Sequence, residues 1–323
     1  MNTPLNPLSP LQPLNHPLFD KHSVKVEIKR DDIIHPIISG NKWRKLKYNL
    51  AHVESQPQLK GAISFGGSYS NHIHAFAYAC FKSNIPCIGI IRGEAQYANN
   101  FTLSCAKRWG MKLHFVDRKT YKRRSDADYL DTLQQQFPDY FIIPEGGSNA
   151  LALQGVSEVI TELNQQTQFD TLITPVGSGG TLAGLVKRNN ESNNTNEAHK
   201  LIGISVLKGA EYLTQEVEDL INKDEKLTNQ VRKQACEWEI LHQFHRGGYA
   251  KFSQDDASRI LALNKTFGID FEPVYSGKML LAFFDLLEQG YFKPNERIIL
   301  LHTGGLQGVG GMVERGILNE ADW

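Results

Sequence analysis

The sequence predicts an α/β protein with parallel-rich open sheets that carry helices on both faces. Along most of the 323 residues, short apolar runs alternate with longer amphipathic runs, which is typical of parallel strands joined by helical crossovers. The composition, 41% hydrophobic and 22% charged, is that of an ordinary globular chain. Lys plus Arg and Asp plus Glu both number 35, so charge gives no reason to expect nucleic acid or an anionic membrane as partner.

The first half of the chain shows the alternation clearly. Residues 1–20 contain repeated prolines and favour an extended arm on the surface. Predicted strands lie at 24–29, 61–65, 86–91, 112–116 and 140–144. Predicted helices lie at 43–53, 70–81, 99–109 and 126–137. This series indicates parallel strands with helical crossovers.

A second series follows in the other half. Its predicted helices lie at 151–164, 181–187, 255–266 and 277–289, and its predicted strands at 171–175, 201–206 and 297–301. The Asn-rich stretch 187–197 is polar throughout, so we expect a mobile surface loop without chemistry.

The cysteines and the N-terminal residues indicate the cellular compartment in which we expect the protein. The four cysteines show no CxxC pairing, so we expect free thiols, with no disulfide scaffold and no metal site. Residues 1–19 lack the basic and apolar regions of a secretory signal, and no apolar run is long enough to span a bilayer. These features indicate a soluble cytoplasmic protein.

Two stretches could hold a small molecule. Ser39-Gly40-Asn41-Lys42 places a lysine between a flexible glycine and a helix, which can present one amine to a site; alone, such a lysine is more often a solvated surface residue. The stretch Gly177-Ser178-Gly179-Gly180-Thr181 follows an apolar strand and opens a helix, so its amides favour an anion. It matches neither a Walker loop nor GxGxxG, and a plain strand-to-helix turn is the alternative.

Five motifs carry a resemblance to a known family. They are SGNKWRKLK at 39–47, SFGGSYSNH at 64–72, PVGSGGTLAGL at 175–185, EPVYSGK at 272–278 and LHTGG at 301–305. In order and spacing they resemble GGNKxRKLE, QSNH, GSxGTxAGL, PVYxGK and HxGG of the pyridoxal-phosphate (PLP) enzymes of the 1-aminocyclopropane-1-carboxylate (ACC) deaminase and D-cysteine desulfhydrase family. The resemblance runs from about Lys29 to Gly305.

This resemblance implies the two-domain PLP-dependent fold type II, which is tryptophan synthase β-like. Residues 1–44 and 155–323 would form a large PLP-binding domain, and residues 45–154 a small domain, with pyridoxal 5′-phosphate between them. Such positions between domains and at strand ends are where open α/β sheets usually bind ligands. A homodimer is also implied, with a small-molecule amino-acid substrate as partner.

The resemblance assigns the cofactor side of the site. Lys42 would carry the cofactor covalently and later move a proton, which a lowered lysine pKa favours. Lys45, one helical turn along, would contact the cofactor, and Asn71 would bond its ring oxygen. Arg44 and Lys47 are expected on a solvated basic face. The remaining cofactor-binding residues are Gly177, Ser178, Gly179, Gly180, Thr181, Ser276 and Thr303.

On the substrate side, the resemblance implies that Ser70 binds the substrate carboxylate and assists proton transfer, with Asn71 and His72 beside it. Plain N-capping by Ser70 is the alternative. Tyr275 and Tyr249 match tyrosines that line the substrate pocket, although either could be a core tyrosine. The catalytic residues expected are thus Lys42, Ser70, Tyr275 and Tyr249, and His74 is expected to be structural.

The residues Ser276 and Thr303 distinguish the two activities of the family. ACC deaminases have Glu and Leu at these positions, whereas D-cysteine desulfhydrases have hydroxyl residues. A carboxylate would keep the pyridine nitrogen of the cofactor protonated, as cyclopropane opening requires, whereas a hydroxyl need not, which suits loss of a Cα proton and a β leaving group.

The prediction is a PLP-dependent lyase that converts D-cysteine or a related β-substituted D-amino acid to pyruvate, ammonia and sulfide by β-elimination. A hydrolase is also expected. ACC deamination to 2-oxobutanoate and ammonia is one alternative. A protein that binds PLP or an amino acid without turnover is another.

Overall fold

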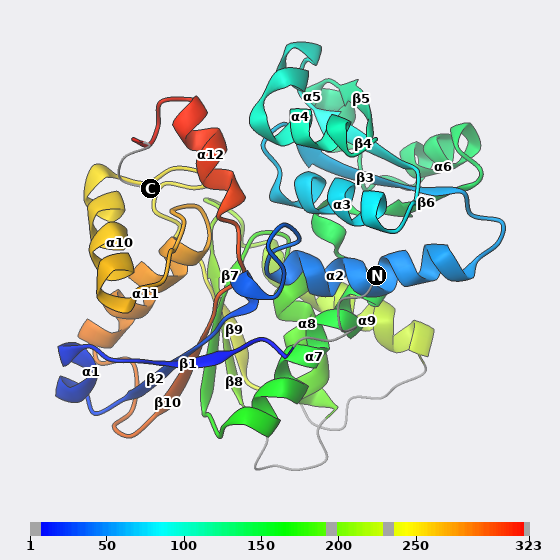
Figure 1. Ribbon diagram of the computed structural model, residues 1–323. Helices are drawn as coiled ribbons and strands as arrows, with labels where there is room; N and C mark the ends of the chain where they lie inside the picture. Colours follow the sequence, from blue (N-terminus) through cyan, green and yellow to red (C-terminus); the bar gives the residue numbers. More distant parts are fainter. Residues whose placement is uncertain (1–7, 192–198, 229–235, 320–323) are drawn as a thin grey trace.

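The computed structural model describes residues 8–191, 199–228 and 236–319, and within them the chain forms two sheets (Figure 1). The six-stranded sheet has the order β1 (Leu11–Leu14), β2 (Lys25–Lys29), β10 (Arg297–Leu301), β7 (Thr171–Val176), β8 (Lys200–Ser205) and β9 (Trp238–Leu241). The four-stranded sheet has the order β5 (Lys112–Val116), β4 (Cys87–Arg92), β3 (Gly61–Gly67) and β6 (Tyr140–Ile143). β1 is antiparallel to β2, and the other described pairings are parallel.

Helices cover both sheets, and one helix lies between them (Figure 1). Around the four-stranded sheet are α3 (Asn71–Lys82), α4 (Phe101–Arg108), α5 (Arg118–Lys122) and α6 (Ala127–Gln136). Around the six-stranded sheet are α1 (Pro17–Lys21), α7 (Ala150–Gln166), α8 (Gly180–Asn190), α9 (Leu213–Thr228), α10 (Gln254–Phe267) and α11 (Ser276–Glu288). The helix between the sheets is α2 (Asn41–Ser55), which packs on α7 and α3, and α12 (Gln307–Glu314) packs on α4.

The apolar strands are buried because helices cover them on both faces. All residues of β7 are buried, and its Leu172 and Ile173 point into different cores. One core packs the six-stranded sheet against α10 and α11, and a second packs its other face against α7, α8 and α9. A third core joins α2, α3 and α4 to the four-stranded sheet. These layers hold the loops at the strand ends in fixed positions.

The predicted α/β alternation is confirmed, and each predicted strand and helix is present with ends shifted by a few residues at most. The N-terminal arm is more regular than expected, because Leu11–Leu14 pair with β2 as an edge strand. Pro13 is tolerated there because one side of an edge strand has no neighbouring strand. A backbone N–H that is missing on that side costs the sheet no hydrogen bond. Pattern alone did not reveal α1, α5, α9, β9 or α12. The four cysteines are free thiols, as expected.

The expectation of a loop at 187–197 is wrong at its start, and residues 192–198 lie outside the described residues. Residues 187–190 complete α8, and Asn189 and Asn190 are buried. Asn189 Nδ2 donates to the carbonyl of His199 at 2.7 Å, and Asn190 Oδ1 accepts from the amide of Cys236 at 2.8 Å. Asparagine side chains that bond to backbone groups in this way explain why a polar run is buried.

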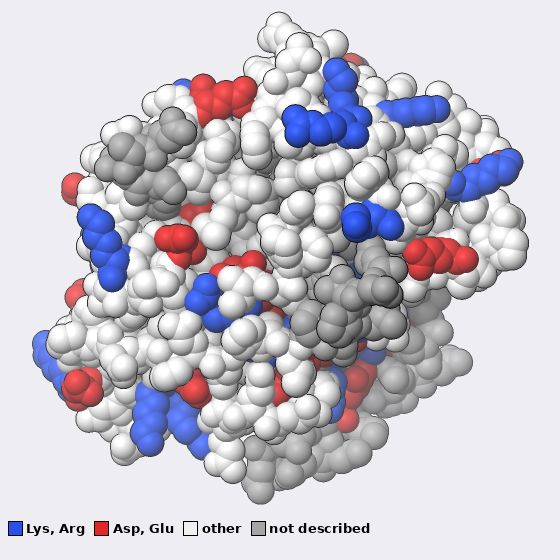
Figure 2. All heavy atoms as spheres, in the orientation of Figure 1, with Lys and Arg blue, Asp and Glu red and all other residues white. Residues whose placement is uncertain are grey.

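Two coarse features of the described residues are the lengths of their apolar helices and the charge on the face shown in Figure 2. No helix of the described segments is both long and apolar enough to cross a bilayer. Basic and acidic side chains both occur on the face shown in Figure 2, most of which is uncharged surface. The domain division at residues 44/45 and 154/155 stays a prediction.

Candidate active site

The predicted site residues lie at the carboxyl ends of strands from both sheets. Gly177–Thr181 follow β7, Thr303 follows β10, and Ser70–His72 follow β3. Side chains join these ends: Asn41 Nδ2 donates to Thr181 Oγ1 at 2.9 Å, and Asn71 Nδ2 donates to the carbonyl of Gly305 at 3.4 Å. The structure therefore brings the motifs together where open α/β sheets bind ligands.

A close approach between two loops positions Lys42. Gly40 has φ +63° and ψ −139°, and a Cβ there would lie 1.9 Å from the carbonyl oxygen of Thr303. Only glycine fits, so the chain can turn sharply into α2. Lys42 Nζ donates to Asn41 Oδ1 at 2.8 Å. Desolvation by burial lowers the pKa of Lys42 to about 8, against the opposing effect of Glu272, so a useful fraction of its amine is neutral near neutral pH.

The glycine-rich turn after β7 forms a cradle suited to an anion. Gly179 is left-handed, with φ +74°, and α8 begins at Gly180. The first amides of a helix have no intrahelical acceptor and lie at the positive end of its dipole. A Cβ on Gly180 would lie 2.4 Å from Ser148 Oγ and 3.0 Å from Lys45 Nζ. The missing side chain therefore leaves room next to a hydroxyl and an amine.

A second segment, which contains Gly146 and Ser148, also lines the glycine-rich turn, and the sequence analysis did not identify it. Lys45 Nζ donates to the carbonyl of Gly146 at 3.2 Å and to Ser148 Oγ at 3.0 Å, and Ser148 Oγ lies 2.9 Å from Ser178 Oγ. Burial, and then the charge of Lys42, lower the pKa of Lys45 well below its usual value. A bound phosphate would restore its charged form. Ser148 lies in the stretch Gly146–Asn149, and nothing in the sequence of that stretch indicated a function.

At the start of α3, Ser70 is an N-cap, because its Oγ accepts from the amide of Ile73 at 3.3 Å. Its hydroxyl hydrogen can still be donated to a substrate. Asn71 faces Gly305, where a Cβ would lie 3.2 Å from Asn71 Nδ2. Ser70 therefore caps α3, as the alternative interpretation predicted. This cap still allows its hydroxyl to bind a substrate carboxylate.

His72 is 3% exposed and lies behind this turn. Its Nε2 is 2.7 Å from Ser64 Oγ, and that hydroxyl donates to the carbonyl of Ile143 at 2.9 Å. Because the hydroxyl hydrogen is used, His72 Nε2 must be the donor, and Nδ1 is an acceptor. Burial, then Lys42 and Lys45, hold its pKa well below the usual value. The direct substrate contact of His72 stays a prediction.

The two predicted tyrosines lie side by side across the glycine-rich turn. Their ring centroids are 6.0 Å apart in an edge-on arrangement. Tyr275 Cε1 lies 3.1 Å from where a Cβ of Gly177 would be, and burial raises the pKa of Tyr275 well above its usual value. Tyr249 is 48% exposed. Tyr275 is therefore a neutral phenol inside the site, and Tyr249 lies at its rim.

Glu272 is a site residue that sequence reasoning missed. It is 1% exposed, and its carboxylate accepts from the amides of Val274, Tyr275 and Ser276 at 2.7, 2.9 and 2.7 Å. Ser276 Oγ also donates to it at 3.1 Å. Burial raises its pKa to about 7, although these hydrogen bonds act in the opposite direction. Its acidic position just before the start of α11 was the available signal.

The expectation that Arg44 is solvated is wrong. Arg44 is 2% exposed and forms ion pairs with Asp31 at 2.6 Å and Glu162 at 2.8 Å. The packing of α2 on α7 buries this face of the helix, which periodicity did not show. Lys47 is half-buried and pairs with Glu158 at 2.6 Å. His74 is structural as expected, since its ring packs on Phe101 and Trp109.

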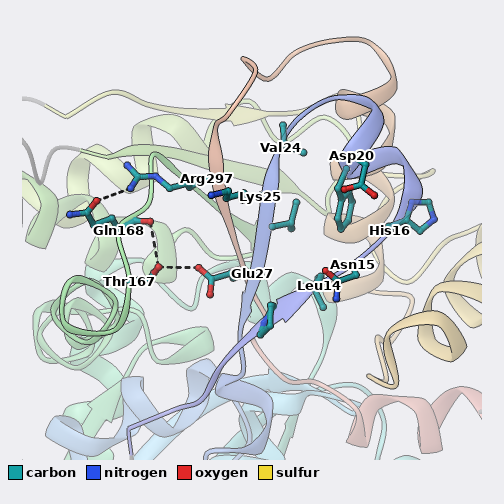
Figure 3. Close-up of a pocket in the computed structure, with 13 residues that line it drawn as sticks. Leu14, Asn15, His16, Asp20, Val24, Lys25, Glu27, Thr167, Gln168 and Arg297 are labelled. Atoms are coloured by element: carbon teal, nitrogen blue, oxygen red, sulfur yellow. Dashed lines mark hydrogen bonds between the residues drawn. The ribbon is translucent and has the colours of Figure 1, made fainter.

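A separate hollow of about 610 Å³ lies at the amino ends of β2 and β10 (Figure 3). It is lined in part by Lys25, Glu27 and Arg297, and Glu27 accepts from Thr167 Oγ1 at 3.0 Å. The lining residues in the described chain include none of the predicted site residues. This hollow is therefore distinct from the site at the carboxyl ends.

Comparison with known proteins agrees with the fold. A family model described as "Pyridoxal-phosphate dependent enzyme" matches residues 1–304. A crystal structure of an ACC deaminase homologue has a TM-score of 0.82 and 27% identity, and the match covers 97% of this chain and 95% of that one. These matches define the class as a PLP-dependent enzyme of fold type II.

Curated relatives narrow the class. A Pyrococcus horikoshii protein with the provisional name 1-aminocyclopropane-1-carboxylate deaminase is 31% identical over 88% of this chain and 85% of its own. A Klebsiella pneumoniae D-cysteine desulfhydrase is 26% identical over 89% of each chain. The chain belongs to the PLP-dependent ACC deaminase and D-cysteine desulfhydrase family. This is a family of lyases, so the expectation of a hydrolase is wrong.

The residues present fit pyridoxal 5′-phosphate. An amine with a lowered pKa (Lys42), a glycine turn at a helix start, and a Lys45–Ser148–Ser178 chain match an aldehyde and a phosphate group. The cofactor prediction is confirmed by the family. The role of each site residue remains a proposal.

Proposed function

We propose that this enzyme catalyses β-elimination from D-cysteine or a related β-substituted D-amino acid, giving pyruvate, ammonia and sulfide. The observation that carries this proposal is the position of Lys42 at the start of α2, next to Asn41, whose Nδ2 donates to Thr181 Oγ1 of the anion cradle at 2.9 Å. Burial there lowers the pKa of Lys42 to about 8, which suits an amine that accepts a proton. Pyridoxal phosphate supplies an electron sink for the pair left by the broken Cα–H bond. Ser276 and Thr303 support elimination, since D-cysteine desulfhydrases carry hydroxyl residues there.

The side chains take complementary roles in this proposal. Lys45, Ser178 and the amides of 177–181 hold the phosphate, and Asn71 bonds the ring oxygen. Ser70 and the first amides of α3 hold the substrate carboxylate. Lys42 removes the Cα proton, and the Cβ–S bond breaks with its electron pair on sulfur. The neutral phenol of Tyr275 protonates the departing thiolate, while Tyr249 lines the rim.

ACC deamination is the second candidate, and one observation favours it. The buried carboxylate of Glu272 lies 3.1 Å behind Ser276 Oγ, so the ring-nitrogen position is not lined by a hydroxyl alone. The similarity to the Pyrococcus horikoshii protein that is provisionally named an ACC deaminase also supports this second candidate. Ring opening would convert ACC to 2-oxobutanoate and ammonia.

The test is a substrate panel with the cofactor-loaded enzyme. D-cysteine, L-cysteine, β-chloro-D-alanine and ACC are supplied separately, and sulfide, pyruvate and 2-oxobutanoate are measured. We expect sulfide and pyruvate from D-cysteine, and pyruvate from β-chloro-D-alanine. Release of 2-oxobutanoate from ACC with no product from any D-amino acid would replace the first proposal by the second. No product from any compound would favour binding without turnover.

The proposal also includes the domain division, a homodimer and a cytoplasmic location, all implied by the family resemblance. Residues 1–44 and 155–323 would form the large domain, and residues 45–154 the small one. Sedimentation of the purified protein tests the dimer, and cell fractionation tests the location. A monomer at concentrations that support full activity would remove the dimer from the account.

A further inference from the structure

Lys278 is a buried lysine that the proposed chemistry does not use. It is the third residue of α11 and is 0% exposed. Its Nζ donates to the carbonyls of Gly248 at 2.5 Å, His245 at 2.9 Å and Val206 at 3.5 Å. A carbonyl oxygen can only accept, so three such partners use the three hydrogens of an ammonium. Lys278 is therefore held as a cation by main-chain carbonyls.

The acidic residues whose charges act on Lys278 have other partners. Burial lowers the pKa of Lys278 to about 8, against the opposing charges of Glu272 and Asp256. Asp256 is paired with Arg246 at 3.6 Å, and Glu272 accepts from backbone amides at the start of α11. In the described part of the chain, the direct partners of the Lys278 ammonium are carbonyl oxygens alone. Carbonyl oxygens around one positive charge are also the donor set that holds monovalent cations in proteins.

Two of these carbonyls shape the segment that carries Tyr249. The carbonyls of His245 and Gly248 open two successive turns, since they accept from the amides of Gly248 and Lys251 at 3.0 and 3.1 Å. Within residues 246–250, positive φ angles from +52° to +109° occur at Arg246, Gly247, Gly248 and Ala250. Two of these residues are not glycine, so the backbone is strained and needs contacts that hold it.

We propose that Lys278 is a positioning residue whose buried ammonium fixes Tyr249 at the rim of the site. This rests on the proposed function, in which Tyr249 and Tyr275 line the substrate pocket. Tyr275 is the N-cap of α11, so one helix start carries both Tyr275 and the lysine that holds the Tyr249 segment. The two rings are thereby kept edge-on, with their centroids 6.0 Å apart. Lys278 acts on the substrate only through these rings.

Because this cation is part of a side chain, the rim does not depend on the salt around the protein. A free ion would have to be bound from solution, with an occupancy set by its concentration. In Lys278→Ala the carbonyls lose their cation, and the shortened side chain leaves room for a potassium or ammonium ion. Lys278→Met also removes the charge, but it keeps most of the side-chain volume and leaves no such room.

The test measures KM and kcat for D-cysteine at constant ionic strength, with tetramethylammonium, potassium or ammonium as the added cation. In tetramethylammonium we expect Lys278→Ala to raise KM about tenfold, the effect of one lost contact of hydrogen-bond strength, with kcat nearly unchanged. Potassium or ammonium should restore the wild-type KM in Lys278→Ala but not in Lys278→Met. Wild type should not respond to the choice of cation. Lys29→Ala is the matched control, because Lys29 is also a buried lysine but lies outside the site, so its KM should stay that of wild type.

Two further measurements separate the positioning of Tyr249 from a general loss of structure. If Lys278 acts through Tyr249, Lys278→Ala adds no further rise in KM to Tyr249→Ala, whereas two independent effects would multiply. Thermal melts require no activity. Potassium and ammonium should raise the melting temperature of Lys278→Ala above its value in tetramethylammonium and leave that of wild type unchanged.

A wild-type KM in Lys278→Met would overturn the inference. A rise in KM that neither ion reverses in Lys278→Ala, and that multiplies with the rise in Tyr249→Ala, would also overturn it. If Lys278→Ala does not fold by circular dichroism, Lys278→Met still decides: a raised KM that does not multiply with that of Tyr249→Ala supports the role. No turnover by wild type, together with a cation effect on the Lys278→Ala melt, would overturn the proposed function and leave the carbonyl-bound cation in place.

Discussion

Arg44 and Asp31 form a buried two-pronged ion pair under the helical turn that presents Lys42. Arg44 Nε lies 2.6 Å from Asp31 Oδ2, and Arg44 Nη2 lies 2.7 Å from Asp31 Oδ1. The guanidinium also donates to both carboxylate oxygens of Glu162 at 2.8 and 2.9 Å, and Lys29 pairs with Glu162 at 2.7 Å. The network joins the segment after β2 to α2 and α7, so it fixes the start of α2.

Arg44→Ala is expected to lower the free energy of unfolding by about 3–5 kcal/mol, because Asp31 and Glu162 would be left buried without their partner. Denaturant titration monitored by circular dichroism measures this change. Lys60→Ala is the matched control: its ion pair with Asp139 is on the surface, so stability should hardly change. Equal effects of the two substitutions would contradict the role given to the buried network.

Gly40→Ala is expected to disrupt the turn into α2, because its Cβ would overlap the carbonyl of Thr303. Gly110→Ala is the control, since Gly110 also has positive φ, +86°, but nothing lies within 4 Å of its Cβ position. The control should cost about 1–2 kcal/mol from backbone strain alone. Thermal melts and cofactor-loading assays should show a larger loss for Gly40→Ala. A loss no larger than that of the control would mean that the close approach is unimportant.

The pKa of Lys42 predicts how fast the apoenzyme takes up its cofactor. The neutral amine attacks the aldehyde, and the folded protein lowers the Lys42 pKa from 10.5 to about 8. The rate of covalent attachment should therefore rise with pH up to about 8 and level off above it. Absorbance-monitored reconstitution between pH 6 and 10 measures this. A rate that keeps rising towards pH 10, as for a free lysine derivative, would show that the amine is not desolvated.

Tyr275→Phe removes a buried hydroxyl but keeps the ring that packs on Gly177. We expect kcat for elimination to fall by about 10²-fold or more, the usual contribution of a proton donor, with cofactor affinity unchanged. Tyr249→Phe, at the exposed rim, should have a much smaller effect. Steady-state kinetics on D-cysteine with both variants makes the comparison. Similar kcat values for Tyr275→Phe and wild type would remove Tyr275 from the chemistry.

Local patterns in the sequence predicted the described strands other than β1 and β9, the main helices, and the stretches around Lys42 and Gly177–Thr181. Contacts between distant segments could not be predicted in this way. Glu272 was overlooked because its importance comes from three backbone amides and Ser276, which a sequence does not display. Arg44 was misjudged for the same reason, since burial on one side of α2 depends on α7.

The most direct test of the account is the absorbance of the cofactor-loaded enzyme before and after D-cysteine, with sulfide measured in parallel. The account predicts a visible band in wild type, a spectral change with sulfide release, and loss of both in Lys42→Ala. Lys47→Ala, on the same helix but outside the site, should behave as wild type. A band that survives in Lys42→Ala, or no band after reconstitution of wild type, would contradict the claim that Lys42 holds the cofactor.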